Sequence, residues 1–286
     1  MLPMDILPGT LYVVATPIGH LDDITLRALH VLRSVSLIAA EDTRHSAVLL
    51  SRHGITTRTT PLHEHNERKA SQTLIQKMQS GASVALISDA GTPAISDPGS
   101  GLVRAAWLAG CPVVPIPGPS AVTALLSVSP LLEGPFHFQG FLPSKNTARR
   151  NALDHLKTLD CPLVFYEAPH RIVDCLRDLG EALGMDRQMT LGKELTKLFE
   201  TLKQGNVKDV LIWLQADITH QKGEFVLVVE GAGEPERDTG EQDRLLEILL
   251  DKLSVSDAVQ VACKLTGASR KTLYARALAL KTEVSP

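Results

Sequence analysis

The segment SDAGTPAISDPGSG at residues 88–101 combines residue types that could bind a small molecule. It holds two carboxylates, Asp89 and Asp97, together with three glycines and two prolines. An ordinary turn between a strand and a helix is specified by about two or three such residues. Backbone groups held rigid by proline, beside carboxylates that accept hydrogen bonds from hydroxyl or amino groups, suit a ligand that contains adenine and ribose. The excess therefore predicts a loop whose shape is set by ligand binding.

Each carboxylate also has a purely structural interpretation. Asp97 precedes Pro98, an order typical of a helix N-cap followed by proline at the first helical position, and capping is the role we expect for it. Asp89 is followed by Ala90 and Gly91, and it fits an Asx turn as well as a ligand contact.

Several familiar binding motifs are missing from the sequence. It has no G-x-x-x-x-G-K-[ST] loop for phosphates and no G-x-G-x-x-G turn after a strand, the nearest match being Gly231 and Gly233. The densest group of histidine and acidic residues, at 63–67, has the spacing of a polar surface loop rather than of a metal site. The cysteines are scattered, so we expect free thiols, no zinc and no disulfide: Cys111, Cys161, Cys175 and Cys263.

The bulk composition is ordinary for a globular protein. The chain has 286 residues, 44% of them apolar and 21% charged, and a net charge of −3, so no global electrostatic attraction to nucleic acid is predicted. No apolar run approaches the length of a membrane span, and the N-terminus lacks a basic region followed by an apolar one. We therefore expect a cytoplasmic protein that does not contact membranes.

The elements that must position the 88–101 loop are short apolar runs alternating with helical patterns over residues 10–128. Continuous apolar strands separated by helices predict a mainly parallel sheet covered on both faces. The runs lie at 11–15, 36–40, 84–88 and 112–116. In such a sheet, ligands bind outside the carboxyl ends of the strands. The loops expected there are 16–23, 40–44, 88–101 and 117–121.

Two further regions follow. Residues 129–232 predict a second, smaller α/β domain with a mixed sheet, and the polar segment 232–243 reads as a linker. Residues 243–282 predict a helical module resembling a helix-turn-helix, with its turn at Gly267. Its second half carries basic residues and no acidic ones up to residue 281: Lys264, Arg270, Lys271, Arg276 and Lys281. This pattern fits contact with nucleic acid, or simply a solvated basic face.

Seven segments in order carry a resemblance to a known family: TPIGHLDDIT (16–25), AAEDTR (39–44), SDAGTPAISDPG (88–99), PGPSA (117–121), FYEAPHR (165–171), KELTKLFE (193–200) and KGEFVLVVEG (222–231). Together they resemble the ribosomal RNA small subunit methyltransferase I family of the tetrapyrrole-methylase superfamily, over about residues 10–281. The resemblance implies two α/β domains with S-adenosylmethionine in the cleft between them, usually in a homodimer. The implied reaction is 2′-O-methylation of a decoding-centre cytidine in 16S rRNA of the small ribosomal subunit.

The resemblance also implies which residues surround the cofactor: Pro17, Asp89, Ala90, Gly91, Thr92, Ser120, Ala121, Tyr166, Glu224 and Leu227. Two positions depart from the family pattern, with His20 in place of the usual asparagine and Lys193 in place of the usual arginine. Because lysine cannot make a bidentate contact, a role for position 193 is less secure than in the family.

A ribose hydroxyl is a poor nucleophile, so a general base or a cation that stabilises the developing alkoxide should assist it. On a helix at 193–200, Lys193 and Lys197 would share a face and Glu194 would pair with Lys197. An ion pair on the surface of an exposed helix would give the same spacing of charged residues. In AEDTR, capping explains Asp42 but not Glu41 or Arg44. The residues expected on the substrate side are Asp42, Arg44, Glu194 and Lys197.

Tyr166, Arg149 and Arg150 each have a functional and a structural interpretation. Tyr166 could contact the cofactor or fill a core, and Arg149 and Arg150 could contact rRNA phosphates from an exposed loop or remain solvated there. Two alternatives to the whole interpretation also stay open. One is a methyltransferase of the same superfamily that acts on a tetrapyrrole or another small molecule, and the other is an RNA-binding protein without catalytic activity.

Overall fold

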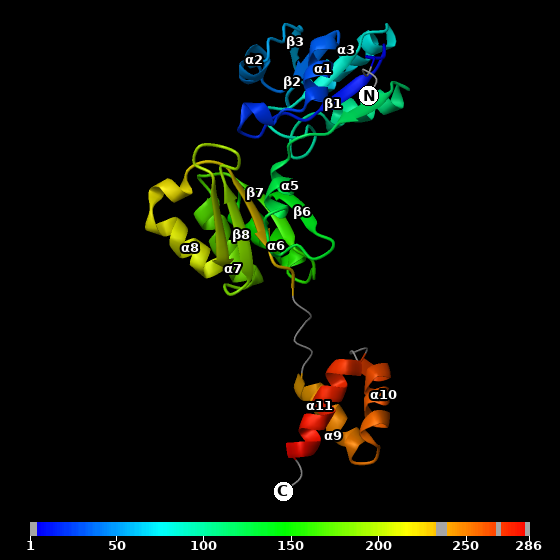
Figure 1. Ribbon diagram of the computed structural model, residues 1–286, viewed down its shortest axis with the longest axis vertical. Helices are drawn as coiled ribbons and strands as arrows, with labels where there is room; N and C mark the ends of the chain where they lie inside the picture. The colour runs from blue at the N-terminus through cyan, green and yellow to red at the C-terminus, as the bar shows by residue number, and fades with distance from the viewer. Residues whose placement is uncertain (1–4, 233–238, 267–269, 284–286) are drawn as a thin grey trace. The chain divides into compact units, whose positions relative to one another are not determined.

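The computed structural model of the chain describes residues 5–232, 239–266 and 270–283 (Figure 1). The chain divides after Gly231 into two compact units. In the first unit, one sheet has the strand order β3-β2-β4-β1-β5 and a second has the order β6-β7-β10-β8-β9. Helices pack on both sheets, which confirms the predicted α/β fold class. No helix within the described ranges is long and apolar enough to cross a membrane.

The first sheet is parallel throughout, as predicted from its apolar strands. Its strands are β1 (Leu11–Val14), β2 (Leu37–Ala40), β3 (Thr59–Pro61), β4 (Val84–Ile87) and β5 (Val113–Ile116). Apolar side chains of α1 (Leu26–Ser34) and α2 (Thr43–Arg52) form the core on one face. Those of α3 (Glu67–Gln79) and α4 (Ser100–Leu108) form the core on the other. This two-sided burial explains why β2 and β4 are apolar at every position.

The second sheet is mixed. Its strands are β6 (His137–Phe141), β7 (Leu163–Glu167), β8 (Gln188–Lys193), β9 (Thr201–Asn206) and β10 (Phe225–Val229). Strands β6 and β7 are parallel, and the remaining pairs are antiparallel. One face carries α6 (Asn146–Leu156), α7 (Ile172–Leu183) and α8 (Val207–Ala216). The other carries α5 (Ala121–Leu126), so the predicted domain boundary near residue 128 falls after a helix that packs on the second sheet.

The prediction of a helix at 193–200 is wrong. Strand β8 ends at Lys193 and pairs with β9 in a register that sets Lys193 opposite Thr201, so the residues between them form a turn. Glu194 and Thr196 have positive φ angles of 51° and 64°, which no α-helix contains. The spacing of the charged residues imitates a helix face, but pairing of β8 with β9 decides the local structure.

The prediction of an exposed loop around Arg149 is also wrong. Arg149 lies on α6, and its side chain is only 5% exposed. It forms an ion pair of 2.5 Å with the buried Asp178 of α7, which also accepts hydrogen bonds from Asn146 and Arg150. Arg149 therefore stabilises the packing of α6 on α7 and is not available to an rRNA phosphate. Arg150 is half exposed and paired with Asp178 and Glu181.

The second unit is helical, with α9 (Thr239–Leu250), α10 (Val255–Thr266) and α11 (Arg270–Glu283). Its core includes Leu246, Val259 and Leu273, one residue from each helix. Helix α9 begins inside the predicted linker, and the predicted turn at Gly267 lies outside the described residues. Arg276, from the predicted basic face, donates to both carboxylate oxygens of Asp243, at 2.7 and 2.6 Å.

Candidate functional site

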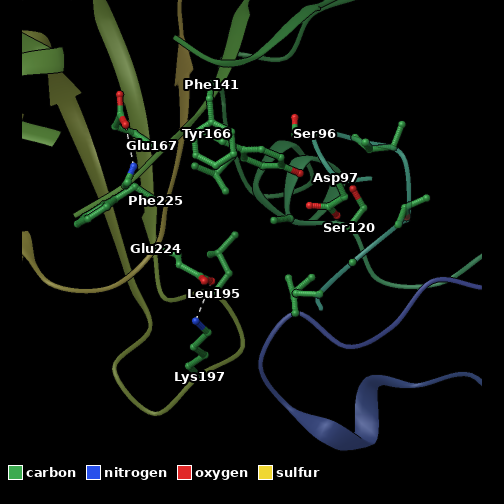
Figure 2. Close-up of a pocket in the computed structure, with 18 of the residues that line it drawn as sticks. Ser96, Asp97, Ser120, Phe141, Tyr166, Glu167, Leu195, Lys197, Glu224 and Phe225 are labelled. Carbon is green, nitrogen blue, oxygen red and sulfur yellow. Dashed lines mark hydrogen bonds and ion pairs between the residues drawn. The ribbon is translucent and has the colours of Figure 1, made fainter. Parts of the chain in front are cut away.

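A cavity of about 340 Å³ lies between the loops of the first sheet and the strand ends of the second (Figure 2). We call it the main cavity. On the side of the first sheet it is lined by Ile18, Ala90, Gly91, Thr92, Ile95, Ser96 and Asp97. On the other side it is lined by Ser120, Ala121, Phe141, Tyr166, Glu167, Ala168, Pro169, Leu195, Lys197, Glu224, Phe225 and Val226.

The loop after β4 is held in a shape that ordinary residues avoid. Gly91 has a φ of 74° and exchanges two backbone hydrogen bonds with Thr16, at 2.8 and 3.0 Å, so the loops after β1 and β4 are joined. Gly99 has a φ of 121°, and a Cβ there would lie 2.7 Å from the Leu86 side chain. The segment is rich in glycine partly because its backbone is left-handed at Gly91 and Gly99, a conformation that glycine adopts without strain.

The far end of the same loop is anchored by Glu67, at the start of α3. Its Oε1 accepts hydrogen bonds from the backbone N–H groups of Gly99 and Gly101, at 3.0 and 2.7 Å. A carboxylate at this position satisfies N–H groups at the start of α4, which have no partner within that helix. Part of the histidine and acidic group at 63–67 therefore has a definite structural role.

The prediction that Asp97 caps a helix is wrong. Helix α4 begins at Ser100 with Gly99 as its N-cap, and Asp97 instead lines the main cavity (Figure 2). Burial and, less strongly, the negative charge of Glu41 together raise the pKa of Asp97 to about 6, against a hydrogen bond from Ser88 that lowers it. Among the described residues, no cation lowers this pKa, so the negative charge of Asp97 is not balanced within that part of the chain.

Replacing Asp97 by asparagine is expected to raise the unfolding temperature of the ligand-free protein at pH 8. Because folding raises the pKa of Asp97 from 3.8 to about 6, its contribution to stability is present below about pH 3.8 and is lost as the pH rises through about 6. Asparagine does not ionise, so the variant does not lose this stability as the pH rises. The increase in unfolding temperature over the wild type should therefore vanish near pH 4. Differential scanning calorimetry between pH 4 and pH 8 measures the unfolding temperature, with Asp154→Asn as a control at an exposed position. Equal destabilisation by Asp97→Asn at both pH values would refute the assignment.

Tyr166 forms the aromatic wall of the main cavity together with Phe141. Its ring lies 5.2 Å from that of Phe138, edge-on, and 5.5 Å from that of Phe141. Burial raises the pKa of the Tyr166 hydroxyl, and the nearby Asp97 raises it further. The ring is therefore a neutral, partly buried surface against which an apolar or aromatic part of a ligand can pack.

The loops after β2 and β4 are tied together by carboxylates. The backbone N–H of Asp42 donates to Asp89 Oδ1 at 3.0 Å, and that of Asp89 donates to Glu41 Oε2 at 3.3 Å. Asp42 is the N-cap of α2 and pairs with Arg44 at 2.9 Å, which lowers the pKa of Asp42 to about 2. Neither Asp42 nor Arg44 is among the residues that line the main cavity.

The turn between β8 and β9 places Lys197 at the edge of the main cavity. Lys197 Nζ bonds Glu224 Oε2 at 2.9 Å (Figure 2). It also bonds Glu194 Oε1 at 2.9 Å, and Glu194 Oε1 accepts a hydrogen bond from the backbone N–H of Glu224. Burial lowers the pKa of Lys197, but the bonds to these two carboxylates outweigh it and raise the pKa. Lys197 is therefore held as a cation.

The same turn packs against the loop after β1. A Cβ on Gly19 would lie 2.5 Å from Lys197 Cγ and 2.6 Å from Thr196 Oγ1. The backbone N–H of His20 donates to Thr196 Oγ1 at 3.1 Å. Glycine at position 19 thus allows the two α/β parts to meet beside the cavity, and the unusual His20 contributes through its backbone.

The structure brings most of the expected cofactor residues to this cavity, with three exceptions. Pro17 and Asp89 line a smaller neighbouring cavity, and the Leu227 side chain is fully buried in the core of the second sheet. The expectation missed the apolar walls Phe141 and Leu195, whose sequence pattern does not distinguish them from ordinary core residues. Glu167, Ala168 and Pro169 could have been predicted from the sequence, because they lie within the FYEAPHR segment that carries the family resemblance.

No group of residues suited to a metal ion occurs in the described part of the chain.

Comparison with known proteins places this geometry in a family. The tetrapyrrole (corrin/porphyrin) methylases match residues 10–211, and the RsmI C-terminal HTH domain matches residues 236–281. A protein of Xylella fastidiosa (strain Temecula1) named ribosomal RNA small subunit methyltransferase I is 48% identical over 93% of this chain and 98% of its own length. A protein of the same name from Escherichia coli O157:H7 is 45% identical over 94% of this chain and 95% of its own.

Solved structures agree on the fold. Uroporphyrin-III-C-methyltransferase from Thermus thermophilus superposes with a TM-score of 0.57 at 21% identity, over 78% of this chain and 94% of that one. The methyltransferase CobJ superposes with a TM-score of 0.60 at 19% identity, over 78% of this chain and 95% of that one. The chain belongs to the ribosomal RNA small subunit methyltransferase I family, within the tetrapyrrole methylases.

Proposed function

We propose that this chain transfers a methyl group from S-adenosylmethionine to the ribose 2′-oxygen of a decoding-centre cytidine in 16S rRNA. The observation that carries the proposal is the similarity to relatives named ribosomal RNA small subunit methyltransferase I, which extends over both the α/β unit and the C-terminal helical unit. With the small ribosomal subunit as acceptor, the protein acts in the cytoplasm. We also expect a homodimer, as in the family.

The residues of the main cavity fit the proposed cofactor. Asp97 offers a carboxylate to ribose hydroxyls or an ammonium group, and the loop at 90–92 offers backbone N–H and C=O groups. Tyr166 and Val226 provide apolar walls for an adenine ring. When bound, S-adenosylmethionine supplies a methyl group on a positively charged sulfur. The unbalanced negative charge of Asp97 suits a cationic ligand of this kind.

The chemistry of the acceptor side rests on Lys197. Its ammonium group is fixed by Glu194 and Glu224 at the cavity edge, so it can stabilise negative charge that develops on the acceptor oxygen. Burial raises the pKa of Glu194, but bonds from the Glu224 N–H and Lys197 outweigh it and lower the pKa. A weakly basic carboxylate suits the orientation of Lys197 better than proton abstraction. The same reasoning excludes Asp42, whose pKa is about 2, as a general base.

Two outer regions are assigned to rRNA binding. Arg44, whose side chain is 90% exposed, is available for a phosphate contact near the loop after β2. In the C-terminal unit, Lys264 and Arg270 carry positive charge at the end of α10 and the start of α11. A tetrapyrrole acceptor would need neither, although solved structures of this fold include enzymes named for that substrate.

Transfer of labelled methyl tests the proposal. The chain is incubated with labelled S-adenosylmethionine and either small ribosomal subunits that lack the modification or a uroporphyrin-type tetrapyrrole. Label in the rRNA of the subunits alone is the expected result. Label in the tetrapyrrole alone would move the acceptor to a small molecule, and tight rRNA binding without cofactor binding in calorimetry would indicate an RNA-binding protein.

A further inference from the structure

A second cavity, of about 270 Å³, adjoins the main cavity at the carboxyl edge of the first sheet. We call it the side cavity. It is lined by the loop after β1, the first turns of α2 and the loop after β4. It shares four residues with the main cavity, which therefore form a common wall: Ile18, Ala90, Lys197 and Glu224.

One residue that lines the side cavity carries a buried polar atom that no described residue satisfies. Ser46, on α2, lines this cavity and is 4% exposed, and its Oγ has no hydrogen-bond partner among the described residues. A buried hydroxyl without a partner destabilises a folded protein, and native structures contain few of them. The hydroxyl of a bound polar molecule would supply the missing partner.

The remaining walls define the kind of molecule. His45 and Asp89 add polar groups beside Ser46, whereas Leu21, Leu49 and Ile87 are apolar. Lys197 contributes its cationic side chain to both cavities. This mixture of polar and apolar walls suits a nucleotide, which combines an apolar base with a hydroxylated sugar. The neighbouring Asp42 and Arg44 do not line the side cavity.

We infer that the side cavity holds the acceptor nucleotide, turned out of the rRNA strand, and that Ser46 Oγ bonds one of its hydroxyl or base groups. The assignment rests on the proposed function. Methyl transfer requires the two reactants to meet face to face, and two cavities that share a wall containing Lys197 provide that arrangement. The larger cavity, with its carboxylate and aromatic wall, takes the methyl donor, which leaves the side cavity for the acceptor.

Two substitutions at Ser46 test the inference. In steady-state assays with small subunits, Ser46→Ala is expected to raise KM for the subunits about three- to tenfold, because one hydrogen bond is lost. Ser46→Leu fills the cavity and is expected to lower kcat/KM about 100-fold. The Kd for S-adenosylmethionine should stay within about twofold in both variants, since the donor occupies the other cavity.

Ser71 provides a matched control. It is also 4% exposed, its Oγ also lacks a partner among the described residues, and it lines a groove between α3 and α4 instead. Ser71→Ala should leave KM unchanged. Ser46→Ala should unfold at the same or a higher temperature than the wild type, because it removes an unsatisfied hydroxyl.

The outcomes separate the inference from the function on which it rests. Active wild type with an unchanged KM in Ser46→Ala overturns the acceptor site but leaves the proposed function intact. A weaker Kd for S-adenosylmethionine in the Ser46 variants assigns the side cavity to the donor and also overturns the inference. A wild type that binds the donor and modifies no subunit overturns both.

Discussion

Replacing Lys197 by methionine is expected to lower kcat by about 100- to 1,000-fold, the effect of removing one group that stabilises charge in a transition state. Methionine keeps much of the apolar stem but loses the ammonium group that bonds Glu194 and Glu224. Because Lys197 is only one wall residue of the main cavity, the Kd for S-adenosylmethionine should change much less than kcat. Single-turnover transfer to small subunits and calorimetry of cofactor binding measure the two effects separately.

Lys222→Met is the control for Lys197→Met. Lys222 is exposed, precedes Glu224 by two residues and lines neither the main nor the side cavity. The Lys222→Met variant removes the same charge from the same region but leaves both cavities unchanged. Its kcat should therefore equal that of the wild type. A kcat for Lys197→Met within about threefold of the Lys222→Met value would contradict a role in the transition state, because removing a group that stabilises transition-state charge lowers kcat far more than that.

Asp178→Ala is expected to lower the free energy of unfolding by about 3–5 kcal/mol, because it leaves a buried charge without its partner. Arg149, 5% exposed at its side chain, would lose its ion pair, and Asn146 and Arg150 would each lose hydrogen bonds. Chemical denaturation followed by circular dichroism measures the change.

The same helix offers the control for Asp178. Asp174 pairs with Arg177 at 3.0 Å, but both side chains are at least half exposed. Exposed pairs of this kind contribute little, so Asp174→Ala should lower the free energy of unfolding by less than about 1 kcal/mol. Equal losses in the two variants would show that the network around Asp178 does not anchor α6 to α7.

The sequence predicts the first sheet and its binding edge well because the relevant signals are local. Runs such as Val84–Ile87 are apolar at every position, and the residues that follow combine glycine, proline and acids. A parallel sheet then requires these loops to meet at one edge. The loops found in this way, 88–101 and 117–121, contain Thr92 and Ser120, both of which line the main cavity.

The errors arise where distant contacts override a local pattern. Asp97 has the sequence context of an N-cap, yet the left-handed Gly99 starts the helix later and leaves Asp97 to the cavity. The turn at Glu194 looks helical until β9 pairs with β8. Arg149 gives no sign that a partner 29 residues away will bury it. Ser46 gives no signal either, since its importance lies in an absent hydrogen bond among the described residues.

The most direct test of the account is to identify the nucleoside that the chain modifies. Small ribosomal subunits labelled by the wild-type protein are digested to nucleosides and analysed by mass spectrometry, with Lys197→Met as the inactive comparison. The account predicts 2′-O-methylcytidine from one rRNA position. A methyl group on a base, or no methylated nucleoside above the Lys197→Met level, would contradict it.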